Sequence, residues 1–172
     1  MTRLSMILAF GLMSACGGTS IPLEVSSGGS GGGSGTTLSP ITTDPGPGED
    51  SSFAALLNEV RLDNGAGNVT YNRQLDSAAQ SHADDMLDNN YFSHTGLNGS
   101  TPWERARAAG YDYRYIGENI AAGYQTEESV LQGWVNSPGH QRNNIDPNFE
   151  EFGLGFAREG NNTRWVLLLG AR

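Results

Sequence analysis

The strongest constraint on how this chain can fold is a low-complexity stretch at residues 26–35, which contains only serine and glycine. A short run of proline, glycine and acidic residues follows at residues 44–50. Neither stretch has the apolar side chains that would offset the loss of conformational entropy on folding. We therefore expect residues 16–50 to form a flexible tether. The folded domain is then confined to residues 51–172, which are enough for one hydrophobic core.

The first 15 residues have the pattern of a secretory signal peptide, with Arg3 followed by an apolar run at residues 6–13. This run is far shorter than the roughly 20 residues of a membrane-spanning helix. Residues 13–16 resemble the lipobox of bacterial lipoproteins, in which cleavage precedes a cysteine that then carries acyl chains; a plain signal peptide with an incidental cysteine is the alternative. We expect a lipoprotein signal peptide at residues 1–15 and an acylated Cys16 that anchors the chain to a membrane of the bacterial cell envelope. Gly17 resembles the signal that directs such proteins to the outer membrane.

The charge and the cysteine content exclude several classes of protein. The net charge is −9, all ten cationic residues are arginine, and there is no lysine. An acidic chain without a basic run is poorly suited to binding phosphate backbones, so we expect no nucleic-acid partner. A single cysteine excludes an intrachain disulfide framework and a thiolate metal cluster.

The folded part combines helical and strand patterns, which indicates an α+β fold. Apolar residues at helical spacing, with capping residues before them and glycine or asparagine after them, predict helices near 51–64, 73–88, 101–110 and from 126. Residues 152–156 and 165–169 predict two antiparallel strands joined across residues 160–162. Gly153 and Gly155 leave one face of the first strand bare, so we expect a close neighbour there. Trp103 and Trp134 lie on apolar helix faces and are expected to belong to the core.

The chain has three histidines, and the sequence around each one indicates its role. His82 lies in the apolar stripe of the 73–88 helix, where a ring bonded to a backbone carbonyl is the usual outcome, so we interpret it as a core residue. His94 and His140 lie in short polar segments bounded by glycine, where side chains are presented to ligands. Between them, Glu118 stands among apolar residues. It is either exposed by alternation or held inward against a partner, and the spacing alone does not decide between these.

Three sequence blocks that carry these residues resemble one family. Residues 92–95 (Phe-Ser-His-Thr), 117–121 (Gly-Glu-Asn-Ile-Ala) and 134–140 (Trp-Val-Asn-Ser-Pro-Gly-His) occur in the order and with the gaps of the CAP superfamily, the cysteine-rich secretory, antigen 5 and pathogenesis-related proteins. The resemblance is to its short bacterial branch. It implies a three-layer α-β-α sandwich with a small central antiparallel sheet.

The resemblance also implies a central cleft with two histidines and two glutamates. His94 and His140 match the histidines, Glu118 matches the first glutamate, and Asn119 and Ser137 are expected to line the cleft. The second glutamate has no counterpart, because Asn136 and Ser137 occupy that region. Two imidazoles without a third anionic ligand would hold Zn²⁺ or another divalent cation weakly, in an open site.

We therefore expect a monomeric, membrane-tethered domain that binds an envelope ligand without reacting with it, the ligand being a lipid, a cell-wall fragment or a protein. The alternative is a weak metal-dependent hydrolase in which His94 and His140 hold the ion and Glu118 is the general base. A vestigial cleft in a purely structural domain is a third possibility. A serine hydrolase is disfavoured, because Ser137 directly before Pro138 is expected to use its hydroxyl as a helix N-cap.

Overall fold

The computed structural model of the chain describes residues 51–172. These residues form, in order, α1 (Ser51–Asp63), β1 (Thr70–Tyr71), α2 (Arg73–Asp88), α3 (Pro102–Ala108), β2 (Tyr115–Ala122), α4 (Glu127–Val135), α5 (Pro138–Asn144), β3 (Glu151–Glu159) and β4 (Asn162–Ala171). The expected signal peptide, Cys16 and the tether lie outside the described residues. Within residues 51–172, no helix is both long and apolar enough to cross a membrane.

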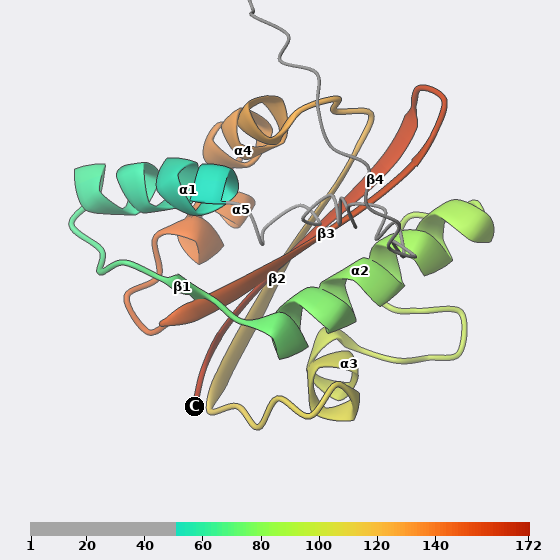
Figure 1. Cartoon of the computed structure of the whole chain (residues 1–172), viewed down its shortest axis with the longest axis horizontal. Helices are drawn as coiled ribbons and strands as arrows, with labels where there is room; N and C mark the ends of the chain where they lie inside the picture. Colours follow the sequence, from blue (N-terminus) through green and yellow to red (C-terminus); the bar gives the residue numbers. More distant parts are fainter. Residues whose placement is uncertain (1–50) are drawn as a thin grey trace, which may run out of the picture. The chain divides into compact units, whose positions relative to one another are not determined.

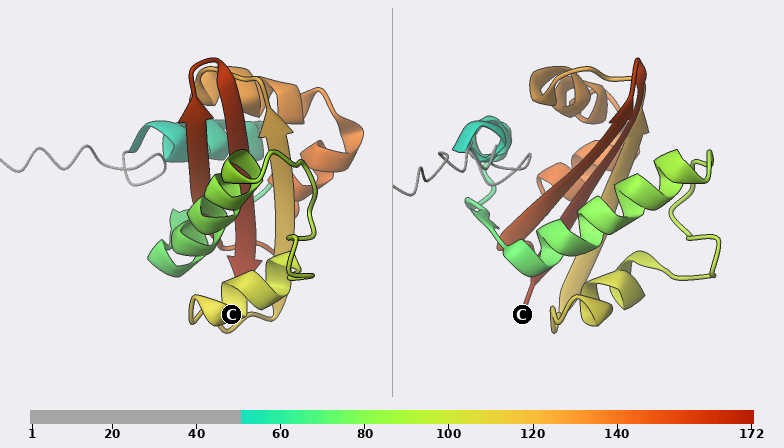
Figure 2. Two further views of the ribbon diagram at one scale, coloured as in Figure 1. Left: turned by 90° about the vertical axis from the view of Figure 1, so that its right-hand side faces the viewer. Right: turned by 45° about the vertical axis from the view of Figure 1, so that its right-hand side comes forward.

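The strands form one sheet in the order β1-β3-β4-β2. The predicted hairpin is confirmed, because β3 and β4 pair antiparallel through residues 151–170, and β2 adds to the other side of β4, also antiparallel. The short β1 pairs in parallel with β3, so the sheet is mixed rather than purely antiparallel. The expected α+β architecture is confirmed, with α2 and α3 on one face of the sheet and α1, α4 and α5 on the other (Figures 1 and 2).

Each face of the sheet has its own hydrophobic core, because successive strand residues point to opposite faces. In β4, Val166 and Leu168 pack with the residues of α2 and α3, whereas Leu167 and Leu169 pack with those of α1 and α4. All four side chains are fully buried. Residues 165–169 of this strand are therefore a continuous apolar run, as expected for a strand covered on both faces.

The bare face of β3 accommodates the backbone of α2. A Cβ atom added to Gly153 would lie 2.0 Å from the backbone nitrogen of Asp76, and one added to Gly155 would lie 2.3 Å from the backbone carbon of Ala79. No other residue type fits at that distance, so the two glycines allow α2 to approach the sheet closely. The close neighbour predicted from the sequence is confirmed.

Two expectations need revision. Trp134 is buried in the core, but Trp103 is 48% exposed, so its assignment to the core was wrong. The buried face of the two-turn helix α3 is formed by Pro102 and Ala106, and the indole lies outside it. Strand β2 was not expected, because its apolar pattern is interrupted by polar Glu118 and Asn119.

Candidate functional site

Glu118 lies on β2, the edge strand of the sheet, opposite Leu168 of β4. Its side chain is only 2% exposed. One carboxylate oxygen, Oε1, lies 2.7 Å from Nδ1 of His94, and the other, Oε2, lies 2.7 Å from Nη2 of Arg105. Of the two alternatives left by the sequence, the structure shows Glu118 held inward against partners.

Arg105 is the partner that sequence reasoning missed. It extends from α3 and is itself only 10% exposed. Besides the ion pair with Glu118, its guanidinium donates to the backbone oxygens of Ser100 at 2.8 Å and His94 at 3.1 Å. The cation thus neutralises the carboxylate and also holds the loop that carries His94. A buried carboxylate requires such a partner, but nothing in the spacing of the sequence indicates which of the arginines supplies it.

His94 lies in the loop between α2 and α3, and its side chain is 52% exposed. A carboxylate can only accept a hydrogen bond, so Nδ1 carries the proton that is shared with Glu118. This orientation leaves Nε2, the other ring nitrogen, on the side away from the carboxylate. A carboxylate that fixes the tautomer of an imidazole in this way is the usual support of a histidine that binds a metal or a polar ligand.

His140 reaches the same edge of the sheet from the opposite face, on α5. The fully buried Asn119 fixes this helix, because its Nδ2 donates to the backbone oxygen of His140 at 3.1 Å and to Oδ1 of Asn144 at 2.9 Å. Asn143 completes the arrangement by donating to Oδ1 of Asn119 at 2.9 Å and to the backbone oxygen of Glu118 at 3.2 Å. Burial lowers the pKa of His140 below its ordinary value, and the nearby charge of His94 lowers it further. The two imidazoles therefore lie within electrostatic range of each other, but His140 is not among the residues that line the hollow beside Glu118.

A second anchor of α5 is Arg61 of α1, which is fully buried. Its guanidinium donates to the backbone oxygens of Asn144 at 2.7 Å and of Asp146 and Phe149 at 3.1 Å. The bond to Asn144 satisfies a carbonyl group at the end of α5, which has no partner within the helix, and the other two bonds hold the segment that follows. Arg61 and Asn119 together determine the position from which His140 approaches the site.

Ser137 stands at the N-cap of α5, followed by Pro138, as expected, but its side chain makes no capping hydrogen bond. The expected use of the hydroxyl as a cap is therefore wrong. No hydrogen bond joins Ser137 to either histidine within residues 51–172. A serine–histidine pair is not formed.

A hollow of about 330 Å³ lies beside the Glu118 carboxylate, and we call it the Glu118 hollow. It is lined by His94, Thr95, Thr101, Pro102, Trp103, Ile116, Gly117 and Glu118. Asn119 and Ser137 are not among the lining residues. The half-exposed indole of Trp103 gives this hollow an aromatic wall opposite polar hydroxyl and imidazole groups.

The described residues do not form a closed metal centre at this site. Within residues 51–172, no group of three or more His, Cys, Asp or Glu side chains is placed to hold an ion. His94 and His140 are the available nitrogen ligands, and Glu118 supports His94 rather than offering a free oxygen. Four-coordinate structural sites draw all ligands from the protein, and the described residues do not provide them.

The arrangement can be compared with known proteins. Residues 54–169 match the family described as CAP, the cysteine-rich secretory protein family. The chain belongs to this family. It is 33% identical over 111 residues to the protein YkwD of Bacillus subtilis, a match that covers 64% of this chain and 43% of YkwD.

Two solved structures show the same fold. An extracellular protein of Bacillus anthracis that contains an SCP domain has 30% identity and a TM-score of 0.63, with 71% of this chain and 40% of that one covered. An outer surface protein of Borrelia burgdorferi has 24% identity and a TM-score of 0.66, with 71% and 91% covered. This chain thus spans less than half the length of YkwD and of the Bacillus anthracis protein. The comparisons place it among the extracellular and surface-associated CAP-domain proteins.

Proposed function

We propose that this CAP domain is displayed outside the cytoplasm and binds an envelope ligand in the Glu118 hollow without reacting with it. The observation that carries the proposal is that both oxygens of Glu118 are already bonded, one to His94 and one to Arg105. To act as a general base, Glu118 would have to give up one of two charge-assisted hydrogen bonds in a buried position, and such bonds are the strong ones. His94, Glu118 and Arg105 are thus held by one another, and the first two line the hollow.

The chemistry of the Glu118 hollow supports a ligand with both apolar and polar parts. Trp103 and Ile116 offer apolar surface, while Thr95, Thr101 and the free edge of the His94 ring offer hydrogen bonds. Lipids and cell-wall fragments both combine such parts, and so does the surface of a protein partner. Aromatic walls with a few polar groups are typical of binding clefts.

For the location, we propose that acylated Cys16 anchors the chain to the outer membrane and that residues 16–50 tether the domain to it. The resemblance of residues 13–16 to a lipobox supports this, as does the extracellular or surface location stated for two of the relatives. The anchor would keep the hollow within reach of envelope components.

The binding proposal is tested by fluorescence, because only one of the three tryptophans is exposed. Trp134 and Trp165 are almost fully buried, so a ligand in the hollow should change the emission of Trp103 alone. The protein is titrated with soluble muropeptides and with phosphatidylglycerol vesicles, and the Trp103→Phe variant is the control. We expect a saturable change that the control lacks, with the muropeptides recovered intact by mass spectrometry. Cleaved muropeptides, or emission unchanged by both probes, would overturn the proposal.

A metal-dependent hydrolase is the second candidate, favoured by the electrostatic influence of His94 on His140, which indicates two imidazoles in one region of the molecule. In this function the two imidazoles would hold Zn²⁺ or another divalent cation, which would supply Lewis-acid chemistry, and Glu118 would be the base. If one equivalent of Zn²⁺ binds and a hydrolytic activity is lost in both His94→Ala and Glu118→Gln, this second function replaces the first. Metal analysis of the purified protein is the first measurement.

A further inference from the structure

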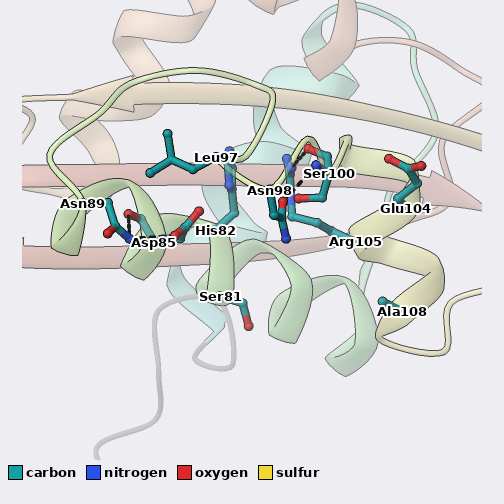
Figure 3. A pocket seen from close by; sticks show the side chains of 10 residues that line it. All are labelled: Ser81, His82, Asp85, Asn89, Leu97, Asn98, Ser100, Glu104, Arg105 and Ala108. Carbon is teal, nitrogen blue, oxygen red and sulfur yellow. Dashed lines mark hydrogen bonds between the residues drawn. The ribbon is translucent and has the colours of Figure 1, made fainter.

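A second cavity, larger than the Glu118 hollow, is lined by different residues. It has a volume of about 550 Å³ and lies between α2, α3 and the loop at residues 97–100. Figure 3 shows its walls: Ser81, His82 and Asp85 come from α2, Leu97 and Asn98 from the loop, and Arg105 and Ala108 from α3. We call it the α2–α3 pocket. Its volume is within the range of pockets that bind small ligands.

Arg105 lies between the two cavities. Its Nη2 faces Glu118, but its Nε is buried and has no hydrogen-bond acceptor among the described residues. The whole side chain is nine-tenths buried, and Figure 3 shows it beside Asn98 and Ser100. A buried N–H group without an acceptor costs about 1–3 kcal/mol. A ligand oxygen in the α2–α3 pocket would be a suitable partner for it.

The remaining walls are rich in uncharged groups that both donate and accept hydrogen bonds. Ser81 and Asn89 contribute such groups from α2 and its C-cap, and Asn98 and Ser100 contribute them from the 97–100 loop. His82 adds an acceptor, because its Nε2 donates to the backbone oxygen of Ser93 at 2.9 Å and Nδ1 is then the unprotonated nitrogen of the neutral ring. Burial lowers the pKa of His82, which keeps the ring neutral near pH 7.

The charged groups of the wall are already bonded within the protein. Asp85 accepts hydrogen bonds from Tyr91 and Asn89, and Glu104 accepts two from Thr101. Arg105 is neutralised by Glu118. A phosphate or carboxylate ligand would meet two carboxylates and only a neutralised arginine. An acyl chain would leave the polar wall groups without partners.

We propose that the α2–α3 pocket is a binding site for a neutral saccharide of one or two rings. A sugar carries hydroxyl groups around its edge, each of which donates and accepts, and so complements the serine and asparagine groups of α2 and the 97–100 loop. The apolar faces of a sugar ring match Leu97 and Ala108, and a ring or hydroxyl oxygen would pair with the buried Nε of Arg105 once that side chain shifts toward the cavity. The inference does not depend on the proposed function of the Glu118 hollow, because the two cavities have different walls.

The proposal is tested with three sugars that differ in charge on the same ring. Glucose, glucosamine and glucuronic acid, together with the disaccharides cellobiose and maltose, are titrated into the ¹⁵N-labelled protein at pH 7. We expect at least one neutral sugar to shift the amide resonances of Leu97 and Asn98 in a saturable way that is independent of salt, while those of Ile116 and Gly117 in the other cavity stay unchanged. Shifts with glucosamine alone would indicate an amine site and overturn the proposal, as would an absence of shifts with all five sugars.

The location of the sugar is tested with two variants in which a larger side chain occupies the α2–α3 pocket. Ala108 and Ser81 are both exposed and line the pocket from α3 and α2, respectively. Ala108→Phe and Ser81→Phe should each weaken neutral-sugar binding about tenfold or more, equivalent to about 1.4 kcal/mol. Ala55→Phe, at an exposed alanine of α1, is the matched control and should leave the affinity unchanged. Unchanged affinity in both pocket variants would place the sugar elsewhere and refute the assignment.

Discussion

Removing Arg105 tests whether the buried ion pair organises the site. In Arg105→Leu, the Glu118 carboxylate keeps its 2% exposure but loses its cation, and the loop loses the bonds to the backbone oxygens of Ser100 and His94. Breaking a buried ion pair from one side costs about 3–5 kcal/mol. A domain of this size has a total stability of about 5–15 kcal/mol, so the loss is a large fraction of it.

The matched control is Arg107→Leu on the same helix. Arg107 is exposed, makes a 3.4 Å hydrogen bond to the hydroxyl of Tyr113 and a cation–π contact with the same ring, and interacts electrostatically with the exposed Glu104. Because these are surface interactions, the substitution should cost less than about 1 kcal/mol. Urea unfolding at pH 7, followed by circular dichroism, measures both variants.

The double variant Arg105→Leu/Glu118→Leu completes the test. Because it removes both charges together, it should be more stable than Arg105→Leu alone, with a coupling energy of about 1 kcal/mol or more. If Arg105→Leu costs no more than Arg107→Leu, or if the two substitutions are additive, the ion pair does not stabilise the site and the reasoning fails.

Three further predictions concern the fold and the anchor. Gly155→Ala places a Cβ atom 2.3 Å from the backbone of Ala79 and should lower the free energy of unfolding by at least about 1–3 kcal/mol. The control is Gly67→Ala, which should be tolerated because nothing lies within 4 Å of its Cβ position. If urea unfolding finds the two variants equally stable, the packing argument is wrong. Burial lowers the pKa of His82 below its ordinary value of 6.5, so the unfolded chain takes up the proton first. The contribution of neutral His82 to the free energy of unfolding should thus be fully present above pH 6.5 and be lost as the pH falls through the folded-state pKa. The variant His82→Gln should show a smaller loss of stability in thermal melts between pH 7 and 5. Cys16→Ser should release the protein from the membrane fraction of cells, and unchanged attachment would count against acylation.

The sequence was sufficient for those features that depend on neighbours along the chain. The helix α2 occupies Arg73–Asp88 as its periodicity predicts, and the hairpin of β3 and β4 forms where two apolar runs flank a turn. Gly153 and Gly155 indicated close packing from their position alone. The resemblance to the CAP family supplied His94, Glu118 and His140, and the structure joins the first two directly by a hydrogen bond.

Features that depend on convergence of distant segments were not accessible in this way. Strand β2 carries two polar residues in succession, and only its pairing with β4 and the contacts on its two faces explain why both are buried. Trp103 satisfies a helical apolar pattern and yet is half exposed, because a two-turn helix covers little of the sheet.

The sequence by itself determined which segments fold locally and which residue types are available for chemistry, because helical and strand periodicity are set by backbone geometry within a few residues. The tertiary structure alone decided that Arg105, rather than another arginine, neutralises Glu118 and lies between two cavities. The partner of a buried charge is the group that packing brings within hydrogen-bond distance. Here that distance depends on α3, β2 and the His94 loop meeting at one edge of the sheet.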